Sequence, residues 1–448
     1  MTRLVLLAAL LLPGLAAAEV RTLAPGDDLA AAAAAAAAGD ELVLSAGIHA
    51  GPVTLDRALT LRGEPGAVLD GGGEGSVVTV TAPGVTIVGL TIRGSGSDRA
   101  AMDSGVVLTK AAKGALVERN TFVDNLHGVH LHGSPDATVR DNAITGRTGR
   151  QADSGNGVMI WNAPGALIEN NDVRFGRDGI FTRVSKNDVF RGNRFEKTRF
   201  AIHYMYTSDS VIEDNVSIDN TVGYAIMFSD RLKIVGNISD GDRDLGLMLN
   251  SSNRSEIRAN RVTGRELPAA RWLTSSQGAE DGMAPASDTP IHAASDRIGP
   301  EKCLFVFNAN KNIIEDNRFE GCGIGIHFTA GAEGNAVAGN AFIGNQTQVK
   351  YVGTRTLDWS ADGRGNYWSD NAAFDLDGDG IADAAYRPND IIDRVMWTAP
   401  QARLLITSPA VQVIRWAQSR FPATLPGGVL DSAPLMAPPP IDAQEHTP

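Results

Sequence analysis

Histidine and methionine side chains recur at matching places in several short apolar segments of the chain. The segments read GVHLH (128–132), GVMIW (157–161), AIHYM (201–205), AIMFS (225–229) and GLMLN (246–250). Thioether sulfur and neutral imidazole nitrogen are donors that suit copper(I), whereas carboxylates would suit calcium or magnesium. We therefore predict a copper(I) site among seven side chains: His130, His132, Met159, His203, Met205, Met227 and Met248.

The same segments indicate which side chains face outward. Because side chains alternate between the two faces of a strand, the mostly apolar second and fourth positions are expected to point into a core. The third position then points outward, and it holds His130, Met159, Phe181, His203, Met227, Met248, Phe305 and His327. With adjacent strands about 4.8 Å apart, we expect His203, Met227 and Met248 to reach one shared ion or partner. The alternative is an apolar stripe covered by another part of the chain or by a partner protein.

A repeat of about 22 residues predicts the elements that position these side chains. Nine asparagines mark it: Asn120, Asn142, Asn171, Asn193, Asn215, Asn237, Asn260, Asn317 and Asn340. They follow one another at 22 or 23 residues, except for two gaps of 29 and 57 that we assign to insertions near 146–156 and 264–301. Short strands and asparagine turns at this period predict an all-β fold, a right-handed parallel β-helix whose coils stack into one core. Asparagine tolerates the left-handed conformation at a tight turn, and its amide can form a ladder between coils. The fixed leucine pattern of leucine-rich repeats is missing.

Composition divides the chain into four parts. Residues 1–18 combine Arg3, an apolar run and three alanines, and predict a secretory signal peptide cleaved near Ala18, hence export to the periplasm. Residues 19–350 form the β-helix, with an alanine-rich helix at its start that caps the open end. Residues 351–400 contain GNYWSD and an acidic segment, and residues 401–448 a helix followed by a proline-rich tail.

The acidic segment resembles the start of a calcium loop. Asp375, Asp377 and Asp379 occupy positions one, three and five before Gly380, and Asp383 fills the ninth position. The twelfth position is Tyr386 rather than glutamate, so the pattern of an EF-hand fails there. We expect either a structural calcium ion or an acidic turn without metal.

Charge and cysteine content exclude several classes of function. The net charge of −12 argues against binding to nucleic acid or to anionic lipid surfaces. Cys303 and Cys322 are the only cysteines, so they either form one disulfide in the exported chain or remain free. The sequence contains no phosphate-binding loop, and we expect no ATP hydrolysis by this chain.

The order of several motifs resembles a known family. After the coils come GNYWSD, FDLDGDGIAD, SPAVQVIRWAQSRFP and LPGGVLDSAPLM. Together they resemble the periplasmic copper-binding maturation proteins of nitrous oxide reductase, the NosD type, over nearly the whole mature chain. The resemblance implies a subunit of an ABC-type complex with a permease and an ATPase. It also implies help in building a copper–sulfide centre, with a copper chaperone lipoprotein as donor, apo nitrous oxide reductase as recipient, and copper, sulfur or both as cargo. It provides no ligand motif, so the copper residues rest on the strand pattern alone.

A β-helix also suits a polysaccharide lyase, epimerase or hydrolase. Such an enzyme needs a carboxylate pair, or a base together with arginine or lysine, on one strand face. The aligned five-residue segments offer methionine, histidine and phenylalanine there, and Arg183 is their only charge. We therefore expect a binding and assembly factor rather than an enzyme.

Overall fold

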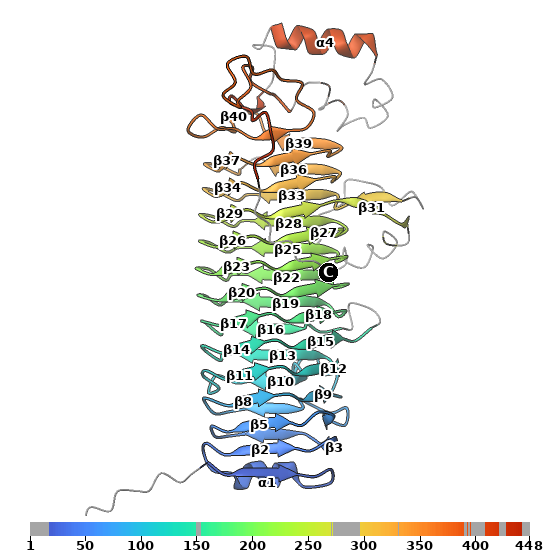
Figure 1. Ribbon diagram of the computed structural model, residues 1–448, viewed down its shortest axis with the longest axis vertical. Helices are drawn as coiled ribbons and strands as arrows, with labels where there is room; N and C mark the ends of the chain where they lie inside the picture. Colours follow the sequence, from blue (N-terminus) through green and yellow to red (C-terminus); the bar gives the residue numbers. More distant parts are fainter. Residues whose placement is uncertain are drawn as a thin grey trace, which may run out of the picture.

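The chain folds into a right-handed parallel β-helix, as the repeat predicts (Figure 1). The computed structural model describes residues 18–148, 154–269, 271, 296–329, 331–388, 392, 395, 408–420 and 427–440. The predicted signal peptide therefore lies outside the described residues, apart from Ala18, as does most of the insertion near 264–301. None of the helices in the described part is long and apolar enough to span a membrane.

Three long sheets run the length of the stack, and every strand in them pairs in parallel with the equivalent strand of the next coil. The first sheet contains β1 (Val20–Leu23), β2 (Glu41–Leu44), β5 (Thr60–Gly63), β8 (Thr86–Val88), β11 (Leu116–Glu118), β14 (Thr138–Arg140), β17 (Leu167–Glu169), β20 (Val189–Arg191), β23 (Val211–Glu213), β26 (Lys233–Val235), β29 (Glu256–Arg258), β34 (Ile313–Glu315) and β37 (Ala336–Ala338).

The second sheet carries the histidine and methionine segments and has the longest strands. It contains β4 (Val53–Leu55), β7 (Val78–Val80), β10 (Ser104–Leu108), β13 (His127–His132), β16 (Val158–Trp161), β19 (Asp178–Arg183), β22 (Phe200–Met205), β25 (Val222–Met227), β28 (Leu245–Asn250), β33 (Lys302–Phe307), β36 (Ile324–Thr329) and β39 (Thr347–Val352).

The third sheet closes each coil. It contains β3 (Gly47–Ala50), β6 (Ala67–Asp70), β9 (Thr91–Arg93), β12 (Thr121–Asn125), β15 (Ala143–Gly146), β18 (Asp172–Arg174), β21 (Arg194–Glu196), β24 (Val216–Ile218), β27 (Ile238–Asp240), β30 (Arg261–Thr263), β35 (Arg318–Glu320), β38 (Ala341–Ile343) and β41 (Tyr367–Trp368). Two short sheets stand apart: β31 (Arg265–Leu267) with β32 (Arg297–Gly299), and β40 (Thr356–Asp358) with β42 (Gly428–Leu430).

The nine repeat asparagines form the predicted ladder between the first and third sheets. In each coil the side-chain Oδ1 accepts a hydrogen bond from the backbone N–H of the ladder asparagine one coil earlier, as Asn215 does from Asn193 at 3.0 Å. The left-handed residue is the one before each ladder asparagine, for example Asp214 with φ 54°, and not the asparagine itself, which corrects our expectation. The ladder amide therefore serves hydrogen bonding between coils, while its predecessor makes the turn.

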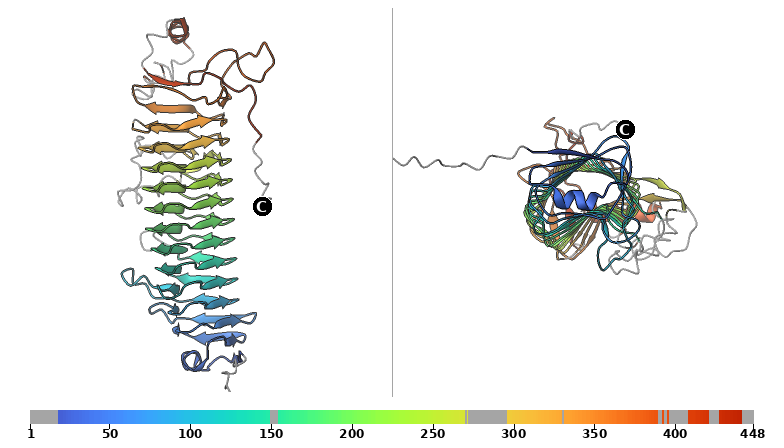
Figure 2. Two further views of the ribbon diagram at one scale, coloured as in Figure 1. Left: turned by 90° about the vertical axis from the view of Figure 1, so that its left-hand side faces the viewer. Right: turned by 90° about the horizontal axis from the view of Figure 1, so that it is seen from below.

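Each end of the stack is covered by a segment of different structure. Helix α1 (Leu29–Ala35) begins at Asp28, whose side chain caps it, and lies across the end of the first coils in the end-on view (Figure 2). It is shorter than the alanine run, and Leu29 joins the main core. At the other end Asp431 accepts hydrogen bonds from the backbone N–H of Asn366 and from Trp368, so it terminates the asparagine ladder.

Two further features lie near the C-terminal half of the stack. Cys303 on β33 and Cys322 form a disulfide, the first of the two alternatives left open by the sequence. Helix α4 (Pro409–Arg420) lies within the segment for which a helix was expected, and the final residues, 441–448, are outside the described part.

Candidate metal-binding face

The second sheet has a packed core on one side and the predicted ligands on the other. The second and fourth positions of the five-residue segments, such as Ile202 and Tyr204, belong to the main core and are fully buried. They are the third and fifth residues of the six-residue strands. The opposite side, here called the outer face, carries the first, fourth and sixth residues of a six-residue strand, which on β22 are Phe200, His203 and Met205. Part of this face forms a second, separate apolar cluster that includes Phe200, Met227 and Met248. The predicted alternation of the strands is therefore correct.

The predicted register of one strand is wrong by two residues. On β25 the partner of His203 is Ala225, and Met227 lies opposite Met205. Met248 on β28 is the partner of Ala225, so it shares a column with His203 but lies two coils away. The sequence alignment had placed AIMFS on this row, whereas the segment actually used is GYAIM (223–227). The correct strand follows from the 22-residue period, which places position 225, and not 227, below His203.

Most of the outer-face candidates are not exposed to solvent. His203 is 2% exposed, Met248 3% and Met227 4%, because neighbouring side chains of the face pack against one another. Only His132 is exposed, and Met205 is half-buried. The expectation of an exposed stripe is thus corrected to a largely buried one.

Strand β19 separates the seven candidates into two groups. His130 pairs in register with Met159, which pairs with Phe181, which in turn pairs with His203. The Phe181 ring lies 4.9 Å from the His203 ring. His130, His132 and Met159 form one group, and His203, Met205, Met227 and Met248 the other, so the structure does not unite all seven at one ion.

His203 is oriented by a buried ion pair. Asp178 accepts a hydrogen bond from Nδ1 of His203 at 3.1 Å and is held by two hydrogen bonds from Arg199 at 2.8 and 2.9 Å. Burial would raise the pKa of Asp178, but the charge of Arg199 and the hydrogen bond from His203 outweigh it and hold that pKa well below its usual range. Since the ionised carboxylate can only accept, Nδ1 of His203 carries the proton of this bond, and Nε2 is the ring nitrogen that remains for a ligand.

That Nε2 atom is buried and has no hydrogen-bond partner among the described residues. A carboxylate on one ring nitrogen and an open lone pair on the other is the arrangement typical of metal-ligating histidines. Met205, two residues further along the same strand, has its side chain on the same face. These two side chains are the donors best suited to a soft metal ion.

Two buried histidines, His127 and His130, lie at the first group and are neutral. Burial and the charges of Arg99 and Arg177 lower the pKa of His127 to about 4, and its Nδ1 accepts a hydrogen bond from the Asn156 backbone. Burial and the neighbouring histidines lower the pKa of His130 to about 3, and its buried Nε2 has no partner in the described part of the chain. His132 stacks on Trp161 at 4.7 Å between ring centroids.

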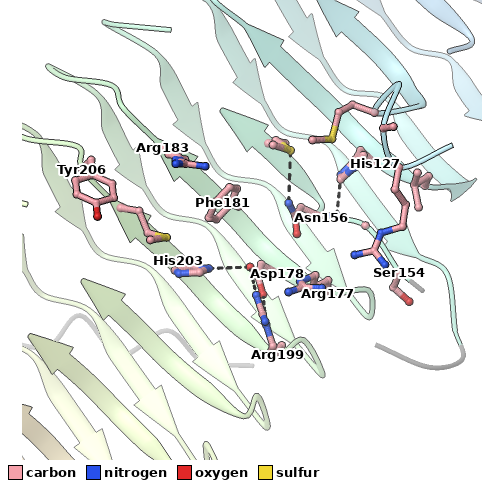
Figure 3. A pocket seen from close by; sticks show the side chains of 17 residues that line it. His127, Ser154, Asn156, Arg177, Asp178, Phe181, Arg183, Arg199, His203 and Tyr206 are labelled. Atoms are coloured by element: carbon pink, nitrogen blue, oxygen red, sulfur yellow. Dashed lines mark hydrogen bonds and ion pairs between the residues drawn. The ribbon is translucent and has the colours of Figure 1, made fainter. Parts of the chain in front are cut away.

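A cavity of about 580 Å³ opens on this face beside β19 and β22 (Figure 3). Three predicted ligands line it, Met159, His203 and Met205, whereas Met227 and Met248 belong to the apolar cluster instead. The cavity is completed by residues of the loop before β10 and of the insertion near 146–156, among them Arg99 and Ser154.

The sequence comparison missed the charged residues of this cavity. Asp178, Arg177 and Arg199 line it but precede the five-residue segments that were aligned. Strand β19 begins at Asp178 and β33 at Lys302, one residue before the aligned segments, so Arg183 is not the only charged residue of these strands. The sequence could have indicated that Asp178 belongs to a strand. Asp178 lies one 22-residue period before Phe200, which is its register partner.

The acidic loop brings its carboxylates together. Oxygens of Asp375, Asp377 and Asp379 lie within 4.8 Å of one another. Asp375 accepts hydrogen bonds from the backbone of Gly378 and Gly380, and Asp383 accepts one from Leu376. These bonds also explain the loop without an ion, and calcium here stays a prediction.

Comparison with known proteins adds to this geometry. The family described as "Periplasmic copper-binding protein (NosD)" matches residues 140–373. A protein of Stutzerimonas stutzeri named "Probable ABC transporter binding protein NosD" is 41% identical over 88% of this chain and 86% of its own length. The chain belongs to the NosD family. A NosD protein of Pseudomonas aeruginosa with the same description is also 41% identical, over 88% of this chain and 87% of its own.

Solved structures support the fold of this NosD-family chain. The A-module of the mannuronan C-5 epimerase AlgE6 from Azotobacter vinelandii superimposes with a TM-score of 0.50 at 14% identity, covering 72% of this chain and 89% of the module. At this identity the likeness shows a shared β-helix and nothing about activity.

Proposed function

We propose that this chain is a periplasmic accessory protein that receives copper(I) for nitrous oxide reductase and holds it at His203 and Met205. In this role it docks a copper chaperone lipoprotein and the apo-reductase, as part of an ABC-type complex whose partner subunits are a permease and an ATPase. Its cargo is copper, with or without sulfur, and ATP is hydrolysed in the partner. Membership of a family described as periplasmic and copper-binding supports the proposal.

The observation that carries the copper assignment is the bonding of His203. Its Nδ1 is fixed by Asp178, and its buried Nε2 has no partner within the described residues. An unpaired polar atom in a buried place is costly, so its retention next to a thioether favours a ligand at that nitrogen.

Strained apolar residues beside the cavity support a docking surface. Val184, Tyr206 and Phe228 are exposed, yet each has a left-handed backbone, with φ of 57°, 49° and 50°. The left-handed turn itself belongs to the coil, since Asn162, Ser251 and Asn308 have it too, but bulky side chains rarely adopt this conformation. The rings of Tyr206 and Phe228 stack at 5.0 Å, and Tyr206 lines the cavity. We assign this surface to the copper chaperone.

Anaerobic titration with copper(I) against a chromogenic competitor tests the site. We expect His203→Ala combined with Met205→Leu to weaken copper(I) binding at least tenfold, because leucine keeps the packing of methionine but removes the sulfur. His130→Ala combined with His132→Ala reports on the first group, and Met227→Leu combined with Met248→Leu on the apolar cluster.

These variants are controls for one another. If the His203 and Met205 variant keeps its affinity for copper(I) and one of the other variants loses it, the site lies elsewhere on the outer face. Equal copper(I) binding by all of the variants, or no copper(I) binding by the unaltered protein, would show that the outer face serves packing and docking rather than metal binding.

A polysaccharide lyase is the second candidate, because Asp178, His203, Tyr206 and several arginines share one cavity. A lyase requires a base and a cation opposite a uronate carboxylate, and these residue types are present. Hydrolysis is less well supported, since Asp178 is the only carboxylate among the residues that line the cavity in the described part. A screen with oligouronates, read as new unsaturated ends, distinguishes the lyase from the copper protein.

A further inference from the structure

The cavity beside His203 is strongly positive although the whole chain is acidic. Its lining contains four guanidinium groups, of Arg99, Arg177, Arg183 and Arg199, and the single carboxylate of Asp178. Asp178 is already engaged by Arg199 and His203. The chain as a whole carries a net charge of −12, so this local excess of positive charge is not a property of its general composition.

The cations lie on several sides of the proposed copper ligands. Arg183 is the register partner of Met205, while Arg199 directly precedes β22 and Arg177 directly precedes β19. Arg99 comes from the loop before β10, and its charge, like that of Arg177, disfavours protonation of His127 across the cavity. Figure 3 shows Arg177 and Arg199 next to Asp178, and Arg183 near Phe181.

Two of these guanidinium groups have no counterion among the described residues. Arg99 and Arg183 are exposed and make no hydrogen bond or ion pair within the described residues. Guanidinium groups present several donors to an oxyanion in a fixed plane, so Arg99 and Arg183 together are suited to anion recognition.

We propose that this cavity binds a small inorganic oxyanion through Arg99, Arg177 and Arg183, next to the copper ligands His203 and Met205. The oxyanion neutralises the guanidinium groups, which otherwise repel a copper ion held by two uncharged ligands. Oxyanion and copper(I) therefore bind with positive coupling. Only this coupling rests on the proposed function; the oxyanion site stands on the arginines alone.

Calorimetric titration of the copper-free mature protein with sulfate tests the oxyanion site. Sulfate is the probe because it binds copper(I) negligibly in solution. We expect saturable binding to the unaltered protein and at least a tenfold loss in the Arg99→Gln, Arg183→Gln double variant. The matched control is Arg140→Gln with Arg191→Gln, which removes the same charge from the first sheet and should leave sulfate binding unchanged.

The coupling is tested by repeating the copper(I) competition with and without sulfate at constant ionic strength. Sulfate should tighten copper(I) binding severalfold in the unaltered protein and have no effect in the Arg99 and Arg183 variant, because linkage is reciprocal. Absence of sulfate binding, equal binding in both double variants, or binding of oligouronate but not sulfate would overturn the oxyanion site. Sulfate binding without any copper(I) binding would instead retain the oxyanion site and reject the proposed copper function.

Discussion

One hydrogen bond determines the chemistry available to His203. Because Asp178 accepts the hydrogen bond from Nδ1, the ring nitrogen that remains for a ligand is Nε2, which is buried beside the cavity. His130, whose Nε2 is equally buried, lacks a carboxylate partner in the described part of the chain and is kept neutral by burial and by its histidine neighbours. His130 and His203 are thus both buried imidazoles, but only the ring of His203 is oriented by a carboxylate within the described residues.

A second buried carboxylate predicts how stability depends on pH. Asp188 accepts hydrogen bonds from Ser185 and from the backbone of Ala166, but its Oδ2 is buried without a partner among the described residues. Burial raises the pKa of Asp188 to about 7 from 3.8. The folded chain therefore holds this proton over a range in which the unfolded chain has lost it, so stability falls as pH rises from about 4 to about 7.

We expect Asp188→Asn to stabilise the protein at pH 8, by at most about 4 kcal/mol, since the amide keeps the acceptor and has no charge to bury. The variant should also lose the decline in stability between the two pKa values. Urea denaturation at several pH values measures both effects, and the exposed Asp141→Asn is the control. A variant less stable than the unaltered protein at pH 8 would show that Asp188 is ionised and paired in solution.

At the scale of the elements, the asparagine ladder makes neighbouring coils interdependent. The Nδ2 of Asn215 donates to Phe190 O and to Asn237 Oδ1, each at 2.9 Å, while its Oδ1 accepts from the backbone N–H of Asn193. All these groups are buried, so each bond lost leaves a polar atom without water or partner.

Asn215→Ala should therefore lower the free energy of unfolding by about 3 kcal/mol or more, since several buried partners are left unsatisfied at once. Urea denaturation followed by circular dichroism gives the value, with Lys233→Ala, an exposed change on β26, as control. A loss below about 1 kcal/mol in Asn215→Ala would mean that the ladder is dispensable for the stack.

The sequence was sufficient for the fold but only partly for the site. The period of 22 residues and the apolar columns predict the coil, because every coil must bury the same face against its neighbours. The sequence pattern aligned Met227 with His203 instead of Met205, because AIMFS and GYAIM both contain alternating apolar residues. Only the 22-residue period distinguishes the two alignments. Asp178 and Arg199 could not be assigned a role from spacing alone, because their meaning depends on the contact with His203.

At the scale of the whole molecule, the candidate site and the C-terminal segment lie at different heights of the stack. The cavity lies on β16 to β22, whereas β40, the partner of β42, lies at the end beyond β39 (Figure 1). Deletion of residues 404–422, which contain helix α4, is expected to abolish assembly with the permease and ATPase while leaving copper(I) affinity unchanged. Co-purification of the subunits measures assembly, and an intact complex with the deleted chain would refute the role of this segment.

The parallel stacking of coils has one more consequence. From β22, the sheet continues through β25, β28, β33 and β36 to β39. Each step adds about 4.8 Å, which places the row of His203 about 24 Å from the last coil. Since hydrogen bonds join every step, this separation is fixed by the number of coils, and not by the residues they carry. The solenoid thus sets the distance between its cavity and its C-terminal end by the number of coils that separate them.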